Sequence, residues 1–362
     1  MSIILFVVVL VALIVVHEFG HLLAAKYFKM RVDEFGIGYP SRAKTFFKKG
    51  GTEYTLNWLP FGGFVKIFGE DGTDTPSPDS FVAKPKWQQA IVLVAGVAMN
   101  LIFAWLLISL TLSLGTPRVI SGEEARTTPD AELIISRVVE GSPAEEAGLK
   151  AGDRIVGAET TSTSFEGVAA EDFTAFIETA EEGVGLTVLR DGETLLVSAR
   201  PETGIIPHDP EKRALGVGVG NVTSAPVPLW YAPILGAEIT YNVTGAVFVG
   251  LINFFAGLFT FSADLSQVAG PVGIAGAVGD ASATGFAALL SLTAIISINL
   301  ALINLIPVPA LDGGRLLFVG IEAITRRPIP AAVAGTMNAV GFGLLILLMV
   351  VVTISDVFKL VG

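Results

Sequence analysis

Three residues near the N-terminus have the types and spacing of a metal-dependent hydrolytic site. His17, Glu18 and His21 form the pattern H-E-x-x-H. On an α-helix this spacing places both imidazoles on one face, one turn apart, where they can share a zinc ion. A glutamate beside the first histidine can accept a proton from a metal-activated water. The pattern therefore predicts zinc chemistry, with His17 and His21 as ligands and Glu18 as general base.

The H-E-x-x-H pattern lies inside an apolar segment that is long enough to cross a membrane. Residues 3–16 are uncharged and apolar, and the first cation after the pattern is Lys26. About 23 helical residues at about 1.5 Å each span a hydrocarbon core of about 30 Å. The segment has no basic start and no A-x-A-type cleavage site, so we interpret it as a retained span and not a signal peptide. Ionisable side chains inside a span indicate a functional site.

The composition is that of a multi-span membrane protein. Of 362 residues, 52% are hydrophobic and 16% are charged, and the mean hydropathy is +0.67. Cysteine is absent, which excludes disulfides and thiolate ligands for a metal. No clustered basic surface of the kind that binds nucleic acid is expected.

Charge is distributed unevenly along the chain and predicts its orientation. Residues 26–90 contain ten Lys or Arg and seven Asp or Glu, whereas residues 116–227 contain nine and twenty. The positive-inside rule places the first, basic segment in the cytoplasm, and the acidic segment then lies outside with the N-terminus. The expected location is the bacterial inner (plasma) membrane, with the acidic domain on the extracytoplasmic side.

Three further apolar segments are expected to span the membrane: residues 90–114, 285–305 and 331–354. The predicted fold is a polytopic α-helical membrane protein with about four transmembrane helices, a membrane-associated β-hairpin region and an inserted α/β domain. Residues 243–263 are long enough to span. A crossing there would, however, put Asp312, a candidate third ligand discussed below, on the opposite side of the membrane from His17. We expect this segment to lie along the outer interface as an amphipathic helix. We expect the chain to divide into a first membrane half (residues 1–115), the inserted α/β domain (118–203), a connector with the interfacial helix (204–284) and a second membrane half (285–362).

Residues 31–70 read as short strands separated by glycines, with a turn at residues 48–51. The stretch W-L-P-F-G-G-F at residues 58–64 is too apolar for a solvated loop. A hairpin that dips into the membrane beside the first span would explain it. A small cytoplasmic β-sheet is the alternative.

Residues 118–203 are polar and acidic and have a mixed α/β pattern. The run G-S-P-A-E-E-A-G-L-K-A-G-D at residues 141–153 resembles the PDZ domains of bacterial proteases. PDZ domains bind extended peptides by adding a strand to a sheet edge. A plain α/β spacer is the alternative.

A catalytic zinc site usually has a third protein ligand. The third histidine, His208, lies in the outer connector, so Asp312 in L-D-G-G at residues 311–314 is the best candidate. Taken alone, Asp312 is better explained as a helix-capping aspartate than as a ligand.

Together these motifs resemble those of the site-2 protease family, and in particular its bacterial RseP-type members with a PDZ domain. The resemblance is carried by H-E-F-G-H at residues 17–21, G-P-V-G-I-A at residues 270–275 and N-L-I-P-V-P-A-L-D-G-G at residues 304–314. It extends over nearly the whole chain. Some relatives have two PDZ domains and a histidine at the position of Arg315, whereas this chain has room for one such domain.

The resemblance implies zinc held by His17, His21 and Asp312, with Glu18 as general base. It implies cleavage within the bilayer of single-span membrane proteins, for example an anti-sigma factor, in regulated proteolysis. It also implies that Asn304, Gly62 and Gly63 engage the substrate, and that a peptide or substrate ectodomain binds the PDZ-like domain.

Two other classes of protein fit parts of the sequence. One is an inactive membrane scaffold that binds peptides through the PDZ-like domain. The other is a membrane-anchored zinc protease that cuts soluble chains, although the position of H-E-x-x-H inside an apolar segment disfavours it. A transporter fits less well, because only one span carries an embedded charged motif.

Overall fold

The computed structural model of this protein describes residues 2–70, 77–206, 209–260 and 269–361, so His208 lies outside the described residues. The chain forms two compact units. The first contains Met1–Thr111 and Leu229–Gly362, and the second contains Leu112–Pro228. The second unit is therefore inserted between two halves of the first.

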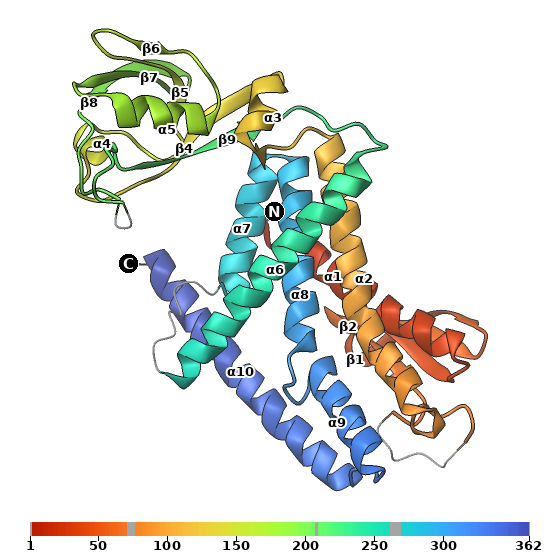
Figure 1. The fold of residues 1–362 in the computed structure, drawn as a ribbon. Helices are drawn as coiled ribbons and strands as arrows, with labels where there is room; N and C mark the ends of the chain where they lie inside the picture. The colour runs from red at the N-terminus through yellow and green to blue at the C-terminus, as the bar shows by residue number, and fades with distance from the viewer. Residues whose placement is uncertain (1, 71–76, 207–208, 261–268, 362) are drawn as a thin grey trace. The chain divides into compact units, whose positions relative to one another are not determined.

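The first unit is built from helices and one β-hairpin (Figure 1). In chain order its elements are α1 (Ser2–Tyr27), β1 (Val32–Lys49), β2 (Thr52–Ile67), the short 3-10 helix η1 (Phe81–Ala83), α2 (Lys86–Ser113, whose last residues belong to the second unit), α6 (Ala232–Phe259), α7 (Pro271–Thr284), α8 (Phe286–Leu305), α9 (Asp312–Thr325) and α10 (Ala331–Val361).

Contacts between helix ends define two ends of this unit. At one end, Phe28 after α1 contacts Trp87 at the start of α2, with ring centroids 5.4 Å apart, and Lys86 pairs with Glu322 near the end of α9. At the other end, Gly279 of α7 lies against Ser2. Since α8 begins directly after α7 and ends toward α9, it runs in the same direction as α1.

Among the described residues, five helices are long and apolar enough to cross a membrane: α1, α2, most of α6, α8 and α10. The chain is thus a polytopic membrane protein, as its composition predicted. Four of these helices correspond to the expected spans. The fifth, α6, covers part of the segment that we expected to be amphipathic. It instead exposes large apolar side chains on neighbouring positions, including Phe248 and Val249.

The predicted short strands at residues 31–70 are two long strands joined at Gly50 and Gly51. Both glycines have positive φ (58° and 85°), as a tight turn requires. The ladder between β1 and β2 has several register shifts, which let two long strands bend. The sequence prediction divided these strands because glycines and Pro60 interrupt their apolar pattern.

The second unit is an α/β domain around a seven-stranded sheet, with strand order β3-β9-β4-β5-β7-β8 and β6 paired to β5. Its elements are β3 (Arg118–Ile120), α3 (Gly122–Thr127), β4 (Ala131–Val138), α4 (Pro143–Glu146), β5 (Arg154–Glu159), β6 (Ser164–Phe165), α5 (Ala170–Thr179), β7 (Val184–Arg190), β8 (Glu193–Ala199) and β9 (Val217–Thr223).

The sheet extends beyond the boundary expected at residue 203. Strand β9 pairs with β3 on one side and β4 on the other, so a segment expected to be a connector lies inside the sheet. Its sequence, V-G-V-G-N-V-T, contains two glycines that weaken the strand pattern. Pairing with two neighbouring strands outweighs that local preference.

A buried ion pair ties the glycine-rich run of this unit to its sheet. Arg190 at the end of β7 donates to both carboxylate oxygens of Asp153, at 2.6 and 2.7 Å, and the Asp153 side chain is 1% exposed. The backbone N–H of Lys150 donates to the same carboxylate at 2.8 Å. Hydrogen bonds from Arg190 therefore hold the pKa of Asp153 below its usual range.

We expect Asp153→Asn to destabilise the second unit at pH 7 by about 2 kcal/mol, because it weakens a charged, buried hydrogen-bonded pair. A lowered carboxyl pKa stabilises the folded state above the unfolded-state pKa, and this contribution disappears as pH falls through the folded-state value. The difference between variant and wild type should therefore shrink as the pH falls below about 4, the ordinary pKa of an aspartate. The stability difference between the variant and the wild type is measured by hydrogen-exchange protection of β5 and β7 in the full-length protein.

Asp191→Asn is the matched control. Asp191 follows Arg190 directly, so this variant removes one negative charge from the same neighbourhood. Its position is an exposed turn with φ of 51°, which asparagine tolerates well. Equal losses of protection in the two variants would mean that net charge, and not the buried pair, sets the stability of this unit.

Candidate metal centre

Helix α1 places its three polar residues in the part of the helix that lies within a membrane core. His17 follows Ser2 by fifteen residues, or about 22 Å of helix, and precedes the end of α1 at Tyr27 by about 15 Å. His17 and His21 are 6% and 7% exposed. Glu18 is half-buried and lies between them in sequence.

Asp312 reaches these histidines from the other end of the chain. Helix α8 ends at Leu305, Pro307 and Pro309 prevent it from continuing, and α9 begins at Asp312. Gly313 and Gly314 allow the start of α9 to fold back onto the end of α8. A methyl group on Gly313 would lie 2.3 Å from the carbonyl oxygens of Leu305 and Ile306. The two glycines of L-D-G-G therefore make the close approach possible.

The three side chains offer donor atoms with the spacing of a zinc site. Asp312 Oδ2 lies 2.9 Å from His17 Nε2 and 3.2 Å from His21 Nε2, and the two Nε2 atoms are 3.2 Å apart. Tetrahedral ligands at about 2.0–2.1 Å from zinc are separated from one another by roughly 3.3 Å. Two imidazoles and one carboxylate, with a fourth position open, form the ligand set of a catalytic zinc. The residues present fit the metal.

Gly96 of α2 leaves space beside the two Nε2 atoms. A methyl group at this position would lie 2.4 Å from His21 Nε2 and 2.8 Å from His17 Nε2. On α1, next to His21, a methyl group on Gly20 would lie 2.2 Å from the carbonyl oxygen of Ala95 in α2. The two helices thus cross at a pair of glycines, and any side chain at Gly96 would collide with the histidine nitrogens.

The second ring nitrogen of each histidine is also occupied. His21 Nδ1 lies 2.8 Å from the carbonyl oxygen of Val92, so it carries the proton and Nε2 has a free lone pair. His17 Nδ1 lies 3.2 Å from the amide nitrogen of Asn100, which is fully buried. Turning this amide by 180° brings its oxygen beside the ring, where it accepts a hydrogen bond from His17 Nδ1–H.

The hairpin lies against the same face of α1. A methyl group on Gly63 would lie 3.2 Å from Ile14 Cγ2 and 3.5 Å from Glu18 Cγ. Gly62, with φ of 101°, turns the strand just before this contact. The structure thus brings β2 beside Glu18 at the position the sequence singled out.

Asn304 lies in the last turn of α8, eight residues before Asp312, and is half-buried. None of the side-chain hydrogen bonds within the described part of the chain involves it. Its place beside the turn that leads to Asp312 agrees with the proximity expected from sequence, and its amide is free to engage another molecule.

Two residues beside the histidines were not assigned to the site from sequence. These are Gly96 and Asn100, both within the expected span at residues 90–114. The signal for Asn100 was its polarity inside an otherwise apolar span. Gly96 carries no such signal, because a glycine in a membrane helix commonly reflects packing alone.

A buried site of two histidines and one aspartate on apolar helices defines the class of membrane-embedded metallopeptidases. A sequence model of peptidase family M50 matches residues 5–348. The chain belongs to this family, the site-2 proteases, and is a zinc metalloendopeptidase.

Relatives from several bacteria align over almost the full chain. A candidate zinc metalloprotease of Clostridium perfringens is 34% identical, over 96% of this chain and 95% of its own. The regulator of sigma-W protease RasP of Bacillus subtilis is 29% identical over 99% of both chains. The zinc metalloprotease RasP of Oceanobacillus iheyensis is 28% identical over 99% of both.

We expect Gly96→Ala to lower zinc occupancy of the purified protein to well below one ion per chain, since the added methyl group fills the space beside both Nε2 atoms. Gly343→Ala in α10, where a methyl group meets no atom within 4 Å, is the control for a glycine change in a membrane helix. Metal analysis by mass spectrometry reads out both variants. Full zinc content in Gly96→Ala would place the metal elsewhere.

Proposed function

We propose that this chain is an intramembrane protease that hydrolyses a peptide bond within the transmembrane segments of single-span membrane proteins. In this proposal His17, His21 and Asp312 hold the zinc ion and Glu18 is the general base. The observation that carries it is the meeting of three donor atoms within 3.2 Å of one another, beside Glu18 and part-way along a membrane helix. A site at this depth in a membrane helix is suited to substrates that lie in the bilayer, and not to soluble chains.

The chemistry divides between the metal and the chain. When bound, zinc would supply a Lewis acid for the scissile carbonyl and for the attacking water. Glu18 would accept the proton of that water and return it to the leaving amine. Asn100 and the carbonyl of Val92 would hold the two imidazoles in the tautomer that presents Nε2 to the metal.

The substrate must unwind before it is cut, because a transmembrane helix hides its peptide groups in i to i−4 hydrogen bonds. Strand β2 passes Glu18 at Gly63, where a methyl group would lie 3.5 Å from Glu18 Cγ. We infer that Gly62 and Gly63 accept the unwound segment as an added strand, and that Asn304 binds one of its freed peptide groups.

The second unit fits the proposal as a PDZ-like domain that binds a peptide or the substrate ectodomain. Its sheet has β3 and β8 at the two edges, and strand addition at an edge is how such domains bind extended chains. In this role it would select substrates for regulated proteolysis, for example of an anti-sigma factor, and take no part in the chemistry.

We infer four spans, α1, α2, α8 and α10, in the bacterial inner membrane, with the second unit outside. Helix α6 begins beside the end of α2, where Trp105 donates to the carbonyl of Pro233 at 2.8 Å. Helix α7 has 14 residues, about 21 Å, too few to cross a core of about 30 Å. It begins where Gly273 N–H donates to Asp356 near the end of α10, at 2.8 Å.

Both ends of the α6–α7 segment therefore lie toward the outer side in this topology. We infer that α6 enters the bilayer or lies along its outer half and then returns, so that α8 runs inward like α1.

Glu18→Gln tests the chemistry. We expect it to abolish cleavage of single-span substrates in detergent, by at least a thousandfold, while the zinc content stays at one ion per chain, because the glutamate acts on the water and is not a ligand. His21→Gln should lose both zinc and activity. Retained cleavage in Glu18→Gln would end the proposed mechanism, and lost zinc would make Glu18 a ligand.

Cysteine labelling tests the topology, since the chain has no native cysteine. A single cysteine at Ser282, exposed in α7, should react with a membrane-impermeant maleimide added outside the cell. A cysteine at Lys49, the last residue of β1 before the hairpin turn, should react only after the membrane is opened. If the cysteines at Ser282 and Lys49 both reacted only after the membrane was opened, α6 would cross the bilayer, which would overturn the four-span topology and the role of Asp312 with it.

A further inference from the structure

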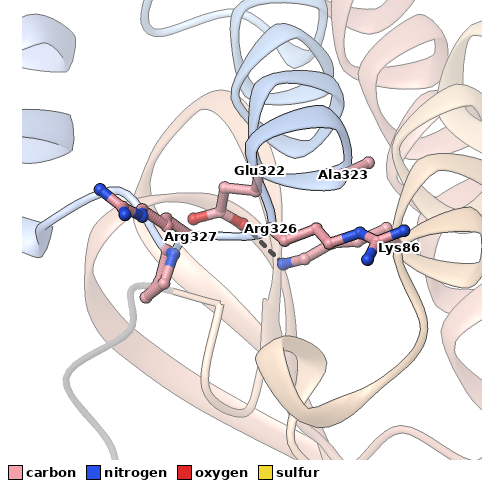
Figure 2. Close-up of a pocket in the computed structure, with 6 residues that line it drawn as sticks. Lys86, Glu322, Ala323, Arg326 and Arg327 are labelled. Atoms are coloured by element: carbon pink, nitrogen blue, oxygen red, sulfur yellow. Dashed lines mark hydrogen bonds and ion pairs between the residues drawn. The ribbon is translucent and has the colours of Figure 1, made fainter.

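A basic pocket lies at the end of the first unit where α2 begins and α9 gives way to α10. It has a volume of about 320 Å3 and is lined by Lys86, Glu322, Ala323, Arg326, Arg327 and Pro328 (Figure 2). It is separate from the candidate metal centre: Asp312 starts α9, and Glu322 lies ten residues, about 15 Å of helix, further on.

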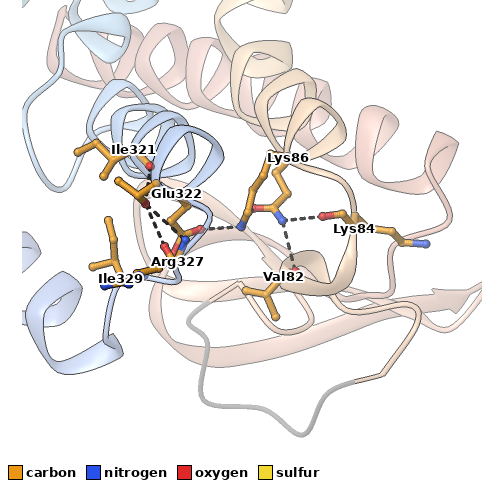
Figure 3. Close-up of polar contacts among 9 residues, drawn as sticks. Val82, Lys84, Lys86, Ile321, Glu322, Arg327 and Ile329 are labelled. Carbon is orange, nitrogen blue, oxygen red and sulfur yellow. Dashed lines mark hydrogen bonds and ion pairs between the residues drawn. The ribbon is translucent and has the colours of Figure 1, made fainter.

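A hydrogen-bond network holds the walls of this pocket in place (Figure 3). Lys86 Nζ lies 2.6 Å from one carboxylate oxygen of Glu322, and the backbone N–H of Ile329 donates to the other at 2.7 Å. Gln89, 1% exposed, donates to the carbonyl of Lys84 at 2.8 Å and accepts from Lys86. The start of α2 is thereby fixed to the turn between α9 and α10.

The network leaves the pocket with excess positive charge. Three cations line it against one carboxylate, a net charge of +2, and Glu322 is already paired with Lys86. The guanidinium groups of Arg326 and Arg327 are exposed, and no ion pair with another described residue involves either of them. Arg326 ends α9 in the left-handed conformation, with φ of 56°, so two arginines follow each other at the helix end. Guanidinium groups favour a phosphate group, and those of Arg326 and Arg327 extend to opposite sides of the Lys86–Glu322 pair (Figure 2).

The surroundings of the pocket identify what carries that phosphate. Trp87, next to Lys86, is 58% exposed, and Ile324, next to the arginines, is 85% exposed. From the pocket, exposed apolar side chains continue along α10 at helical spacing: Val333, Met337, Val340, Leu344 and Leu347. Interfacial tryptophan and an apolar track beside a cationic pocket are the features of a lipid site between membrane helices.

We propose that this pocket binds the phosphate headgroup of an anionic phospholipid, whose acyl chains lie along α10. Arg326 and Arg327 contact the phosphate, and Lys86 completes the positive wall. The leaflet is the one at this end of the helices, the cytoplasmic leaflet in the topology inferred above. A zwitterionic lipid gains less here because its own cation opposes the two arginines.

Binding of defined lipids to the delipidated full-length protein tests the proposal. Native mass spectrometry in detergent compares phosphatidylglycerol with phosphatidylcholine of the same acyl chains. The wild type should bind phosphatidylglycerol more tightly, and Arg326→Gln/Arg327→Gln should weaken that binding by roughly 30-fold, at about one basic residue's contribution for each arginine. Phosphatidylcholine binding should be the same in both proteins.

Lys44→Gln/Lys49→Gln is the matched control, since it removes two exposed charges from β1, away from the pocket. This variant should keep the wild-type preference. Equal losses in the two double variants, or no loss in the arginine variant, would overturn the proposal. Secondary structure by circular dichroism and zinc content confirm that each variant is folded.

Inorganic phosphate and glycerophosphoglycerol distinguish a lipid from a soluble phosphate. Neither should displace bound phosphatidylglycerol at equal concentration, because both lack acyl chains to contact α10. Displacement by either would show that the pocket binds phosphate alone and would overturn the lipid assignment.

Discussion

The structure depends on holding polar donor atoms together inside an apolar bundle. Two imidazoles and a carboxylate taken out of water cost free energy unless each polar atom has a partner. The first unit meets this constraint by letting α1 and α2 cross at Gly20 and Gly96, so that the carbonyl of Val92 and the amide of Asn100 reach the outer nitrogens of the histidines. The remaining ring nitrogens, Nε2 of His17 and of His21, meet Asp312 Oδ2 within 3.2 Å.

This constraint explains the layout of the rest of the chain. His17 and Asp312 are 295 positions apart in sequence, and α8 must run in the same direction as α1 to bring them together. The chain between the end of α2 and the start of α8 must therefore begin and end on the same side of the membrane. In the proposed topology the inserted α/β unit and the α6–α7 segment both satisfy this requirement, so an inserted domain can interrupt the chain between the ligands without separating them.

The two ends of α9 have different tasks in this arrangement. Its first residue, Asp312, joins the metal centre, and the glycines that follow fix its direction against the end of α8. Its last turn holds Glu322, which ties α2 and the start of α10 together through Lys86 and Ile329. A phospholipid bound beside Arg326 and Arg327 would steady the end of the helix that carries a proposed ligand, and so couple the membrane to the active site.

Local patterns in the sequence were sufficient for much of this protein. H-E-x-x-H inside an apolar segment, L-D-G-G after a broken helix and the glycine turn at residues 48–51 each depend on neighbours a few positions away, so spacing alone revealed the two histidines, Glu18 and the hairpin. The membrane class followed from composition. Asp312 was the best remaining candidate for a third ligand, and the resemblance then assigned it that role, because spacing along one segment says nothing about a partner 295 positions away.

Only the tertiary structure decided the features that depend on pairing between distant segments. Strand β9 was hidden because its glycines weaken its own preference, and its two neighbouring strands supply the hydrogen bonds that hold it. Gly96 became part of the metal centre only when α1 crossed α2, and Arg326 and Arg327 became a pocket only beside Lys86. In each case the deciding contact joins residues that are far apart in sequence, where local propensity carries no information and packing does.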